Sequence, residues 1–521
     1  MSKITVPSIS RYCAFNFALL ALIYVWFWHQ NQAIQMPEAT LGNNEKIQCV
    51  SYSPYYKEDV TPLDINTKIS PEQIDHDLAI LSKQFACVRI YSVGQGLDHV
   101  PEAAKKLGMK VYLGAWIGWI KKLNEKELTL AISLANQYPE TVKALIVGNE
   151  VLLRGEQSEA SLKTYIERAK QSVQVPVTYA DVWEFWRKHP KLESSVDFVT
   201  VHILPYWEDQ PQPIDKAIDH TKNIMHILQT SFHKPILIGE TGWPAMGRQR
   251  EGAQPSALNQ ALYIRSFLQV TKEKQWDYNL IEAFDQPWKR KLEGTVGGYW
   301  GIYNAHFQQK FSFSGPISER QDGAKPLFAG LLGGFLFLAF GLLFRTLNSK
   351  NMIAWLSLGA LAGIFALLQY EYLLAACRTP QEWLTLGGVA VLGWISLFSI
   401  PVYLSKQSSL AKALIQTTST ALMLSALTAN YLLITDGRYR DFSIGLYALP
   451  IIQIAVGLSL AQQRIRFQLK LFKWLGILLL ISASACVSLE PTNLLAWAWL
   501  ALNLLLAFIH WPKKETLISP T

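Results

Sequence analysis

The part of the chain after Pro326 limits most strongly how this sequence can fold. It contains seven apolar stretches, each near the roughly 20 residues that a helix needs to cross about 30 Å of hydrocarbon. Another apolar and aromatic run, Tyr12 to His29, lies near the amino terminus. Because one soluble globule does not distribute its apolar residues so unevenly, we predict eight membrane helices. The seven later stretches cover residues 327–344, 353–375, 383–404, 411–434, 443–461, 472–489 and 493–511.

The amino-terminal run follows a short basic start, as both cleaved signal peptides and retained anchors do. No small-residue cleavage site follows it, and Trp26, Trp28 and His29 are typical of a membrane-interface belt. We therefore favour a retained signal anchor over residues 1–31. A folded domain over 32–310, a linker over 311–326 rich in Ser, Gly and charge, and a transmembrane bundle over 327–521 complete the expected organisation.

The charge distribution predicts how the chain is oriented in a lipid bilayer. The formal net charge is +8, yet residues 1–31 carry +2, residues 327–521 carry +7 and the middle carries −1. The basic balance therefore reflects membrane topology, and no nucleic-acid partner is expected. With a cytoplasmic amino terminus, the short outer loops hold only Arg378, Arg438 and Arg440, which puts both termini in the cytoplasm and the middle domain outside it. The inner side then holds Lys3, Arg11, Arg345, Lys350, Lys406, Lys412, Arg464, Arg466, Lys470, Lys473, Lys513 and Lys514.

Few polar residues interrupt the apolar stretches, the notable ones being Glu371, Gln416, Asn430 and Gln453. An acid inside a membrane helix is a functional candidate by default. Glu371 lies near the outer end of its helix, within reach of water, so we favour a structural role for it. An anchor, a partner-docking surface and a polymer conduit all remain open for the bundle.

The cysteine and glycine patterns argue against metal and cofactor sites. Five cysteines are too few for a disulfide framework, and no Cys/His cluster has zinc spacing. Cys49 and Cys87 fall on two expected strands, where we expect buried thiols, although an oxidising compartment would permit a bond. No Gly-x-Gly-x-x-Gly follows the first strand and no Walker loop is present, so no nucleotide cofactor is expected.

The middle domain alternates short β-branched or aromatic runs with helical patterns. Eight such strands over about 295 residues suit a (β/α)₈ TIM barrel of the α/β class, whose usual size is about 250 residues. A doubly wound sheet is the rival fold. The expected strands are 47–52, 87–91, 110–115, 144–149, 175–179, 198–202, 236–240 and 278–284, and the helices between them include 71–84, 98–107, 125–138, 158–173, 213–231 and 255–274.

In a TIM barrel the chemistry lies at the carboxyl ends of the strands, so the residues there are the candidate site. Glu150 ends strand four and Glu240 ends strand seven, and across a barrel mouth two carboxylates suit retaining glycosidic-bond chemistry. One protonates the leaving oxygen while the other attacks the anomeric carbon from about 5–5.5 Å away. Arg89 is the expected donor to Glu240, and Asn149 the expected contact to a sugar 2-hydroxyl. The remaining candidate substrate-binding residues are Tyr52, Tyr91, Trp116, Tyr179, His202, Tyr206, Trp243, Glu282, Asp285 and Trp288.

Aromatic residues are dense around these strand ends. Sugar rings stack on flat apolar faces, so the set suggests a groove with several subsites, although any single Trp serves as well to fill the core. The tryptophans concerned are Trp116, Trp119, Trp183, Trp186, Trp207, Trp243, Trp288 and Trp300.

Several stretches resemble glycoside hydrolase family 17, the β-1,3-glucan-active barrels, over residues 46–310. They are Val147-Gly-Asn-Glu150, Ile238-Gly-Glu-Thr-Gly-Trp-Pro244, Ser51-Tyr-Ser-Pro-Tyr55 and Val88-Arg-Ile-Tyr91. The chain is more similar still to the bacterial membrane-bound branch, described as β-glucan synthases or glucanosyltransferases. That branch is matched by residues 177–186, His202-Ile-Leu-Pro-Tyr-Trp-Glu-Asp209, 282–290 and 293–300.

The resemblance implies a role for each matching residue. Glu150 corresponds to the general acid/base and Glu240 to the nucleophile. Plant and fungal members place an acid and a Lys after strand eight, for which Asp285 and Lys289 are the nearest matches here, at a different spacing and beside Trp288.

We therefore expect a retaining enzyme acting on β-1,3-glucan, held in a bacterial inner membrane with its barrel in the periplasm. Transfer to a sugar hydroxyl, with a β-1,6 branch as one product, is favoured over hydrolysis. The alternatives are a membrane-anchored β-1,3-glucan hydrolase and a carbohydrate transporter or sensor. The expected partners are a β-glucan oligosaccharide or polysaccharide, the lipid bilayer and a glucan synthase or export protein.

Overall fold

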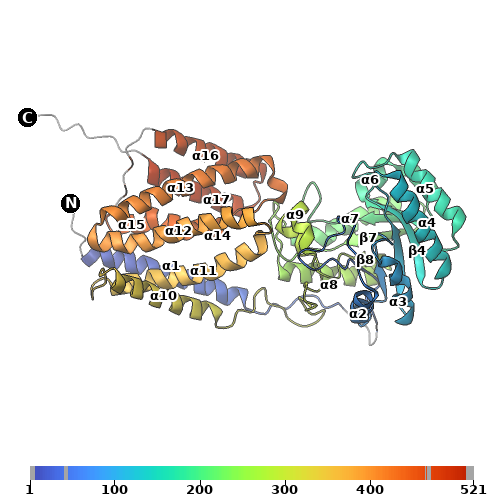
Figure 1. Ribbon diagram of the computed structural model, residues 1–521, viewed down its shortest axis with the longest axis horizontal. Helices are drawn as coiled ribbons and strands as arrows, with labels where there is room; N and C mark the ends of the chain where they lie inside the picture. The colour runs from blue at the N-terminus through green and yellow to red at the C-terminus, as the bar shows by residue number, and fades with distance from the viewer. Residues whose placement is uncertain (1–5, 40–44, 464, 466, 468–470, 512–521) are drawn as a thin grey trace, which may run out of the picture. The chain divides into compact units, whose positions relative to one another are not determined.

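The computed structural model describes residues 6–39, 45–463, 465, 467 and 471–511 (Figure 1). The chain divides into two compact units. The barrel unit comprises Gln35–Gly247 and Gly252–Ile317, and the helical unit comprises Met1–Ile34, Arg248–Glu251 and Ser318–Thr521.

The barrel unit is built on eight parallel strands that close on themselves. Each strand pairs with the next along the chain, and Val50 of the first pairs with Leu280 of the last. The predicted (β/α)₈ barrel is therefore confirmed, and the rival doubly wound sheet is wrong because such a sheet stays open. The strands are β1 (Val50–Ser51), β2 (Cys87–Arg89), β3 (Lys110–Ala115), β4 (Val142–Asn149), β5 (Val177–Val182), β6 (Val199–His202), β7 (Ile236–Thr241) and β8 (Asp277–Leu280).

Helices surround the strands and cover their outer faces (Figure 1). Three begin at a serine, Ser70, Ser158 or Ser256, whose hydroxyl accepts a backbone N–H of the first turn. Each helix then buries an apolar stripe against the strands. The helices are α2 (Pro71–Leu81), α3 (Val100–Lys106), α4 (Lys121–Gln137), α5 (Glu159–Ser172), α6 (Trp183–Lys188), α7 (Ile214–Ser231), α8 (Ala257–Lys274) and the short α9 (Arg290–Glu293).

The barrel unit reaches further along the chain than the sequence indicates. Phe311 and Ile317, which fall in the expected linker, are buried in the barrel core. The unit accordingly ends at Ile317.

Strands β1 and β2 are joined by a disulfide between Cys49 and Cys87. The expectation of two separate buried thiols is therefore wrong. Because Val50 pairs with Val88 in the sheet, the residues before them face each other with their Cα atoms 4.4 Å apart. The sequence places both cysteines on strands, whereas only the register brings them together.

Removing this bond is expected to destabilise the barrel. The two cysteines are 38 residues apart, and releasing a loop of that length costs about 4 kcal/mol in the chain-entropy description. A Cys49→Ser variant should therefore unfold at lower denaturant concentration, followed by tryptophan fluorescence of the detergent-purified chain. Reductant should lower the midpoint of the unaltered protein and leave the variant unchanged. Equal reductant sensitivity in both would contradict the bond.

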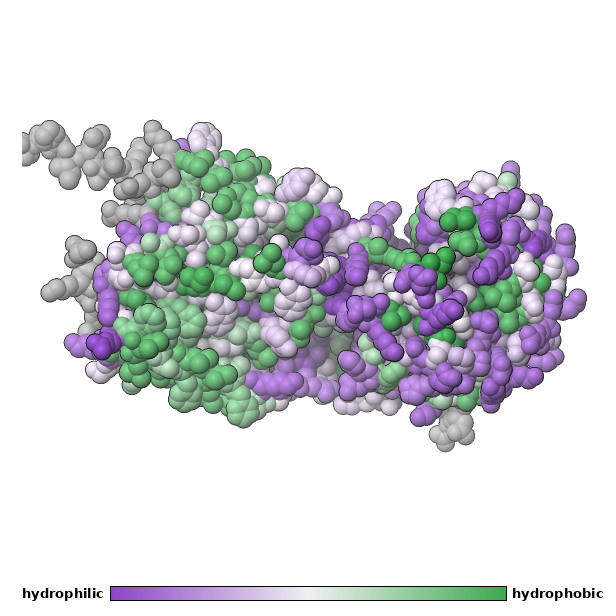
Figure 2. Space-filling model, viewed as in Figure 1, coloured by the Kyte–Doolittle hydropathy of each residue, from purple (hydrophilic) through white to green (hydrophobic). Residues whose placement is uncertain are grey.

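The helical unit contains the apolar helices. Within the described part of the chain, six helices have the length and composition to cross a membrane. They are α1 (Val6–Gln30, with Ser8–Gln30 as the candidate span), α10 (Lys325–Leu343), α11 (Met352–Ala376), α12 (Pro380–Lys406), α13 (Ser409–Thr435) and α16 (Leu471–Leu489). Two shorter apolar helices complete the set. One is Ile444–Leu460, formed by α14 (Ile444–Ile452), a π-helical turn (Gln453–Gly457) and α15 (Leu458–Leu460); the other is α17 (Leu494–His510). Each apolar stretch predicted after Pro326 is thus helical in the described residues, and Figure 2 shows large hydrophobic areas over this unit.

Small and amide residues hold the helical unit together. Helices α10 and α11 approach so closely that a Cβ on Gly333 would lie 2.2 Å from the carbonyl oxygen of Gly359. Elsewhere Gln453 accepts from Tyr12 (2.9 Å) and donates to Asn16 (2.9 Å), which joins α1 to the π-helical turn. Two more of the polar residues that interrupt the apolar stretches also contact other side chains of this unit. Asn430 contacts Ser482, Trp499 and Asn503, and Glu371 accepts both of its contacts from Arg320.

The topology prediction depends partly on residues that the structure does not describe. Lys3, Arg464, Arg466, Lys470, Lys513 and Lys514, which carry half of the inner positive charge, lie outside the described residues.

Candidate functional site

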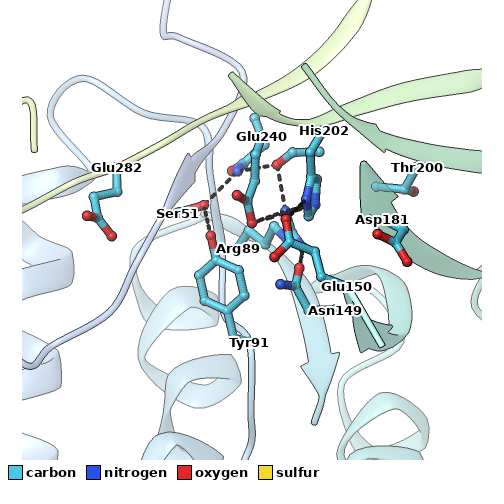
Figure 3. A network of polar contacts seen from close by, with 12 residues as sticks. Ser51, Arg89, Tyr91, Asn149, Glu150, Asp181, Thr200, His202, Glu240 and Glu282 are labelled. Carbon is cyan, nitrogen blue, oxygen red and sulfur yellow. Dashed lines mark hydrogen bonds and ion pairs between the residues drawn. The ribbon is translucent and has the colours of Figure 1, made fainter. Parts of the chain in front are cut away.

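Two carboxylates and one imidazole converge at the carboxyl ends of the strands (Figure 3). One oxygen of Glu150, one oxygen of Glu240 and one ring nitrogen of His202 all lie within 4.8 Å of one another. Glu240 belongs to β7, Glu150 follows β4, and His202 ends β6. Closure of the barrel therefore brings together residues that are up to 90 positions apart in the sequence.

A tight turn after β4 presents Glu150 to the barrel mouth. Gly148 has a φ of 87°, and a Cβ there would meet Val151 at 2.7 Å. Glu150 itself has a φ of 53°, a region that non-glycine residues seldom occupy and that is enriched at functional sites. Its backbone N–H donates to the carbonyl of Ala180 at 2.7 Å, which ties the turn to β5.

Arg89 hydrogen-bonds to both of the strands that lead to the two acids, β4 and β7. Its Nη1 donates to the Gly239 carbonyl (2.6 Å) and to Glu240 Oε1 (3.2 Å), and its Nη2 donates to Asn149 Oδ1 (2.5 Å). The guanidinium is buried, with only 1% of the residue exposed. The buried guanidinium thus gives the Glu240 carboxylate a charge-assisted hydrogen bond that holds it in place. The expected Arg89–Glu240 contact is present.

His202 lies between the two carboxylates. Its Nδ1 is 2.8 Å from Glu150 Oε1, and its Nε2 is 3.3 Å from Arg89 Nη1 and 3.5 Å from Glu240 Oε1. Arg89 has only donors to offer, so Nε2 accepts in that contact and Nδ1 donates to Glu150. Burial raises the pKa of Glu150, but the hydrogen bond from His202 and the nearby positive charges outweigh it and hold that pKa below its usual value.

A second acidic pair lies beside the first. Both oxygens of Glu282 accept from Lys289 Nζ, at 2.9 and 2.8 Å, while Asp285 accepts from Lys310 at 2.8 Å. Lys289 therefore pairs with Glu282, and Asp285 pairs with Lys310. Burial raises the pKa of Glu282 to about 7, although Lys289 opposes the shift.

Several residues expected to bind substrate are buried by the protein itself. Tyr52 donates to Asp77 (2.9 Å), Tyr179 donates to Asp181, and Tyr206 packs against Trp243 and Trp300. These three tyrosines and Trp243 are at most 1% exposed, so they support the site and do not line it. The Asp285 carboxylate is likewise engaged within the protein, because it accepts from Lys310 and from the Gly301 N–H. Among the candidates, Trp116 is exposed and Tyr91 and Trp288 are half-buried, whereas Arg89, Asn149, His202 and Glu282 are buried around the carboxylates.

Sequence reasoning missed two residues of this network. Asn279 of β8 donates to Ser51 (2.8 Å) and to the Gly239 carbonyl (2.8 Å). Ser51 in turn contacts the Tyr91 hydroxyl at 2.9 Å, so these groups brace the strand that carries Glu240. Arg154, the other residue, contacts the Asn149 carbonyl. An amide inside an apolar strand is the sequence signal that could have identified Asn279.

Within the described residues, Glu150, His202 and Glu240 form the group whose atoms converge closely enough to hold a metal ion. Arg89 already places a positive charge 3.2 Å from Glu240, and His202 directs its Nδ1 proton at Glu150. The donor set therefore suits organic acid/base chemistry better than cation binding.

Asp181, next to this site on β5, is expected to make the stability of the barrel depend on pH. Burial raises its pKa to about 6, with the charge of Glu150 adding to the effect. Between its ordinary value of 3.8 and about 6 the folded chain binds more protons, so the free energy of unfolding falls as pH rises. The loss is about 3 kcal/mol at most, and Asp181→Asn should remove it. Thermal midpoints of both proteins across that pH range would test this, and identical slopes would contradict it.

The site residues lie within a stretch that matches known proteins. Residues 49–301 match the family described as "BtgE/BtgC glycoside hydrolase domain". The probable beta-glucosidase btgE of Aspergillus flavus is 27% identical over 260 residues, which cover 48% of this chain and 41% of that protein. The glucan 1,3-beta-glucosidase of Arthroderma benhamiae is 26% identical over 269 residues, covering 48% of this chain and 86% of that one. The chain thus spans less than half of the btgE relatives.

An active-site mutant of the Rhizomucor miehei beta-1,3-glucanosyltransferase in complex with laminaritriose is 26% identical, with a TM-score of 0.46, over 52% of this chain and 99% of that one. An endo-laminarinase from Formosa is 22% identical, with a TM-score of 0.43, over 51% of this chain and 84% of that one. Over residues 49–301, the barrel of this chain is thus similar to the BtgE/BtgC glycoside hydrolase domain.

Proposed function

We propose that the chain is a membrane-held, retaining β-1,3-glucan transglycosylase. The observation that carries the proposal is the approach of the two carboxylates, whose nearest oxygens lie within 4.8 Å. Retaining glycosidases place these groups about 5–5.5 Å apart, whereas inverting enzymes need about 6.5–9.5 Å to admit a water. Arg89 beside Glu240 and the proton-bearing His202 beside Glu150 support two different roles for the two acids.

In the first step Glu240 attacks the anomeric carbon of the donor and forms a glycosyl-enzyme ester. Glu150 gives its proton to the departing glycosidic oxygen, so the bond to the leaving glucan breaks as the ester forms. Glu150 needs its proton at this stage, although its pKa is low in the free site. A glucan lying between the carboxylates excludes water, and burial is the effect that raises the pKa of this acid.

In the second step Glu150 accepts a proton from the incoming nucleophile, which attacks the same carbon and releases Glu240. The hydrogen bond from His202 stabilises the ionised form of Glu150 and so favours this base role. A sugar hydroxyl as nucleophile makes a new glycosidic bond, and water makes a hydrolysis product. We favour transfer, including a β-1,6 branch on a β-1,3 chain, because a membrane-held enzyme suits the building of an envelope glucan.

The substrate class is supported by the names of the relatives. The curated proteins include glucan 1,3-beta-glucosidases and a probable glucan endo-1,3-beta-glucosidase. A membrane-anchored hydrolase is the second candidate. A transporter or sensor is disfavoured, because such a protein has no need of two carboxylates positioned for acid/base and nucleophilic roles.

Product analysis tests this proposal. The detergent-purified chain is incubated with a β-1,3-gluco-oligosaccharide, and the products are identified by mass spectrometry and proton NMR. Products longer than the substrate, with a new linkage signal and retained β configuration, are expected. Only shorter products would favour the hydrolase, and an α configuration of the first product would exclude the retaining mechanism. Lack of any reaction would contradict the substrate class.

We also propose that the barrel lies on the periplasmic side of a bacterial inner membrane, with a glucan synthase or export protein as partner. The charge asymmetry of the apolar ends supports this orientation. The Cys49–Cys87 disulfide supports it independently, because such bonds persist in oxidising compartments.

A topology reporter tests the orientation. A reporter fused after Lys514 is expected to give a cytoplasmic signal, because eight crossings return the chain to the side of its amino terminus. A matched fusion within the barrel, for example after Lys191 on its exposed surface, should give a periplasmic signal. A periplasmic signal after Lys514 would contradict the arrangement of eight helices.

A further inference from the structure

The loop between β3 and α4 holds large apolar side chains in water. Trp116 is 40% exposed, Trp119 is 69% exposed and Ile120 is 59% exposed. The loop follows the carboxyl end of β3, which is the end of the barrel where the carboxylates lie. Exposed apolar groups that gather in one place usually mark a binding surface.

Hydrogen bonds fix the shape of this loop. Asn124 donates to the Gly118 carbonyl and accepts from the Gly118 N–H, both at 2.8 Å, and Gln157 donates to the same carbonyl at 2.6 Å. The Trp116 N–H donates to Glu127 at 3.3 Å. The exposed indoles are therefore presented by a braced backbone, so a ligand that stacks on them does not have to order the loop.

Arg154 ties the loop to the catalytic strand. Its guanidinium lies 4.3 Å from the centre of the Trp116 ring and contacts the carbonyls of Asn149 and Ile117. It is also paired with Glu156 at 2.6 Å. One face of the Trp116 ring is thus covered by a cation, and the position of the ring is linked through one side chain to the residue before Glu150.

The position of the loop indicates which part of the substrate it meets. In a closed barrel of eight strands in chain order, β3 lies opposite β7, which carries Glu240. Displacement at the anomeric carbon is in line, so the leaving oxygen departs on the side away from Glu240, where Glu150 protonates it. The leaving or incoming glucan therefore extends from Glu150 toward the loops after β3 and β4.

We propose that Trp116 and Trp119 form an acceptor platform, a site on which a β-1,3-glucan chain stacks so that its hydroxyl reaches the glycosyl-enzyme ester. The platform rests on the proposed transglycosylase function and adds the residues that favour a sugar acceptor over water. Glucopyranose rings with equatorial hydroxyls present apolar C–H faces, which suit an indole. The charged rim of Arg154 and Glu156 offers hydrogen-bonding partners to the hydroxyls at the ring edges.

The test compares Trp119→Ala and Trp116→Ala with a matched control, Leu107→Ala. Leu107 is 37% exposed and lies at the end of α3, before β3, on the opposite end of the barrel. Each full-length, detergent-purified variant is given an aryl β-glucan donor and β-1,3-gluco-oligosaccharide acceptors of increasing length. In both Trp variants we expect the acceptor concentration for half-maximal transfer to rise about tenfold for long acceptors, with a larger share of hydrolysis products.

Several outcomes would overturn the platform. They are unchanged acceptor dependence in both Trp variants, the same loss in Leu107→Ala, or a loss that follows the length of the donor and not of the acceptor. An inactive unaltered protein would contradict the proposed function instead. In that case the platform is tested by calorimetry, which measures the binding of a β-1,3-gluco-oligosaccharide to each variant. The platform requires weaker binding in the Trp variants than in Leu107→Ala.

Discussion

Replacing Glu240 with Gln is expected to stop turnover of β-1,3-glucan almost completely, by roughly 10⁴-fold or more in kcat. The amide cannot form the ester to the anomeric carbon, so the first displacement has no nucleophile. The fold should survive, because the side-chain oxygen of Gln can still accept the Arg89 hydrogen bond that Glu240 accepts at 3.2 Å. The rate of donor consumption by the purified chain, measured beside its thermal midpoint, checks both statements.

A matched control distinguishes the effect of losing Glu240 from the effect of losing a carboxylate elsewhere on the barrel. Glu273 on α8 is exposed and pairs with neighbouring Lys274, so Glu273→Gln should keep full activity. Near-normal turnover by Glu240→Gln would remove Glu240 from the nucleophile role. A fall in the thermal midpoint comparable to that of a core variant would show that inactivity came from misfolding.

Replacing Glu150 with Ala is expected to produce the second large effect, a loss of about 10²- to 10⁴-fold on glucan. The loss should depend on the leaving group. An aryl glucoside with an acidic phenol needs no protonation, so its first step should remain fast while the ester then accumulates. Azide, which needs no general base, should restore turnover and give a β-glucosyl azide, whose configuration is read by NMR.

Glu167→Gln is the control for this variant, because Glu167 lies on the exposed face of α5 and pairs with Lys163, away from the carboxylates of the site. It should retain activity and show no response to azide. Absence of azide rescue in Glu150→Ala, with normal folding, would contradict the acid/base assignment. An α-configured azide would contradict the retaining mechanism.

Local sequence patterns predicted much of the fold. Apolar strand runs separated by amphipathic helices indicated the barrel, and β3 has the predicted bounds, Lys110–Ala115. The β1 prediction was less accurate, since only Val50–Ser51 form a strand. Pairing in a barrel ends where the neighbouring strands diverge, and a propensity pattern contains no information about neighbours. Phe311 and Ile317 were likewise assigned to a linker, because their partners in the core are distant in sequence.

The candidate site was also predictable in part from the sequence and in part only from the tertiary structure. Glu150 and Glu240 were identifiable because each follows an apolar run inside a Gly-containing turn at a strand end. The tyrosines Tyr52, Tyr179 and Tyr206 have the same positional signal, yet they are buried, because burial depends on what packs over a strand end. Only the tertiary structure shows that Lys289 pairs with Glu282 and that His202 lies between the two carboxylates.

By itself the sequence determined the types of element, the chemistry available at each strand end and the separation of a neutral domain from apolar helices. These properties depend on residue type and short-range periodicity. The tertiary structure alone decided the Cys49–Cys87 bond, the pairing of each lysine with its acid and the approach of Glu150 to Glu240 within 4.8 Å. These contacts depend on strand register and barrel closure, which arise from packing between residues far apart in the chain.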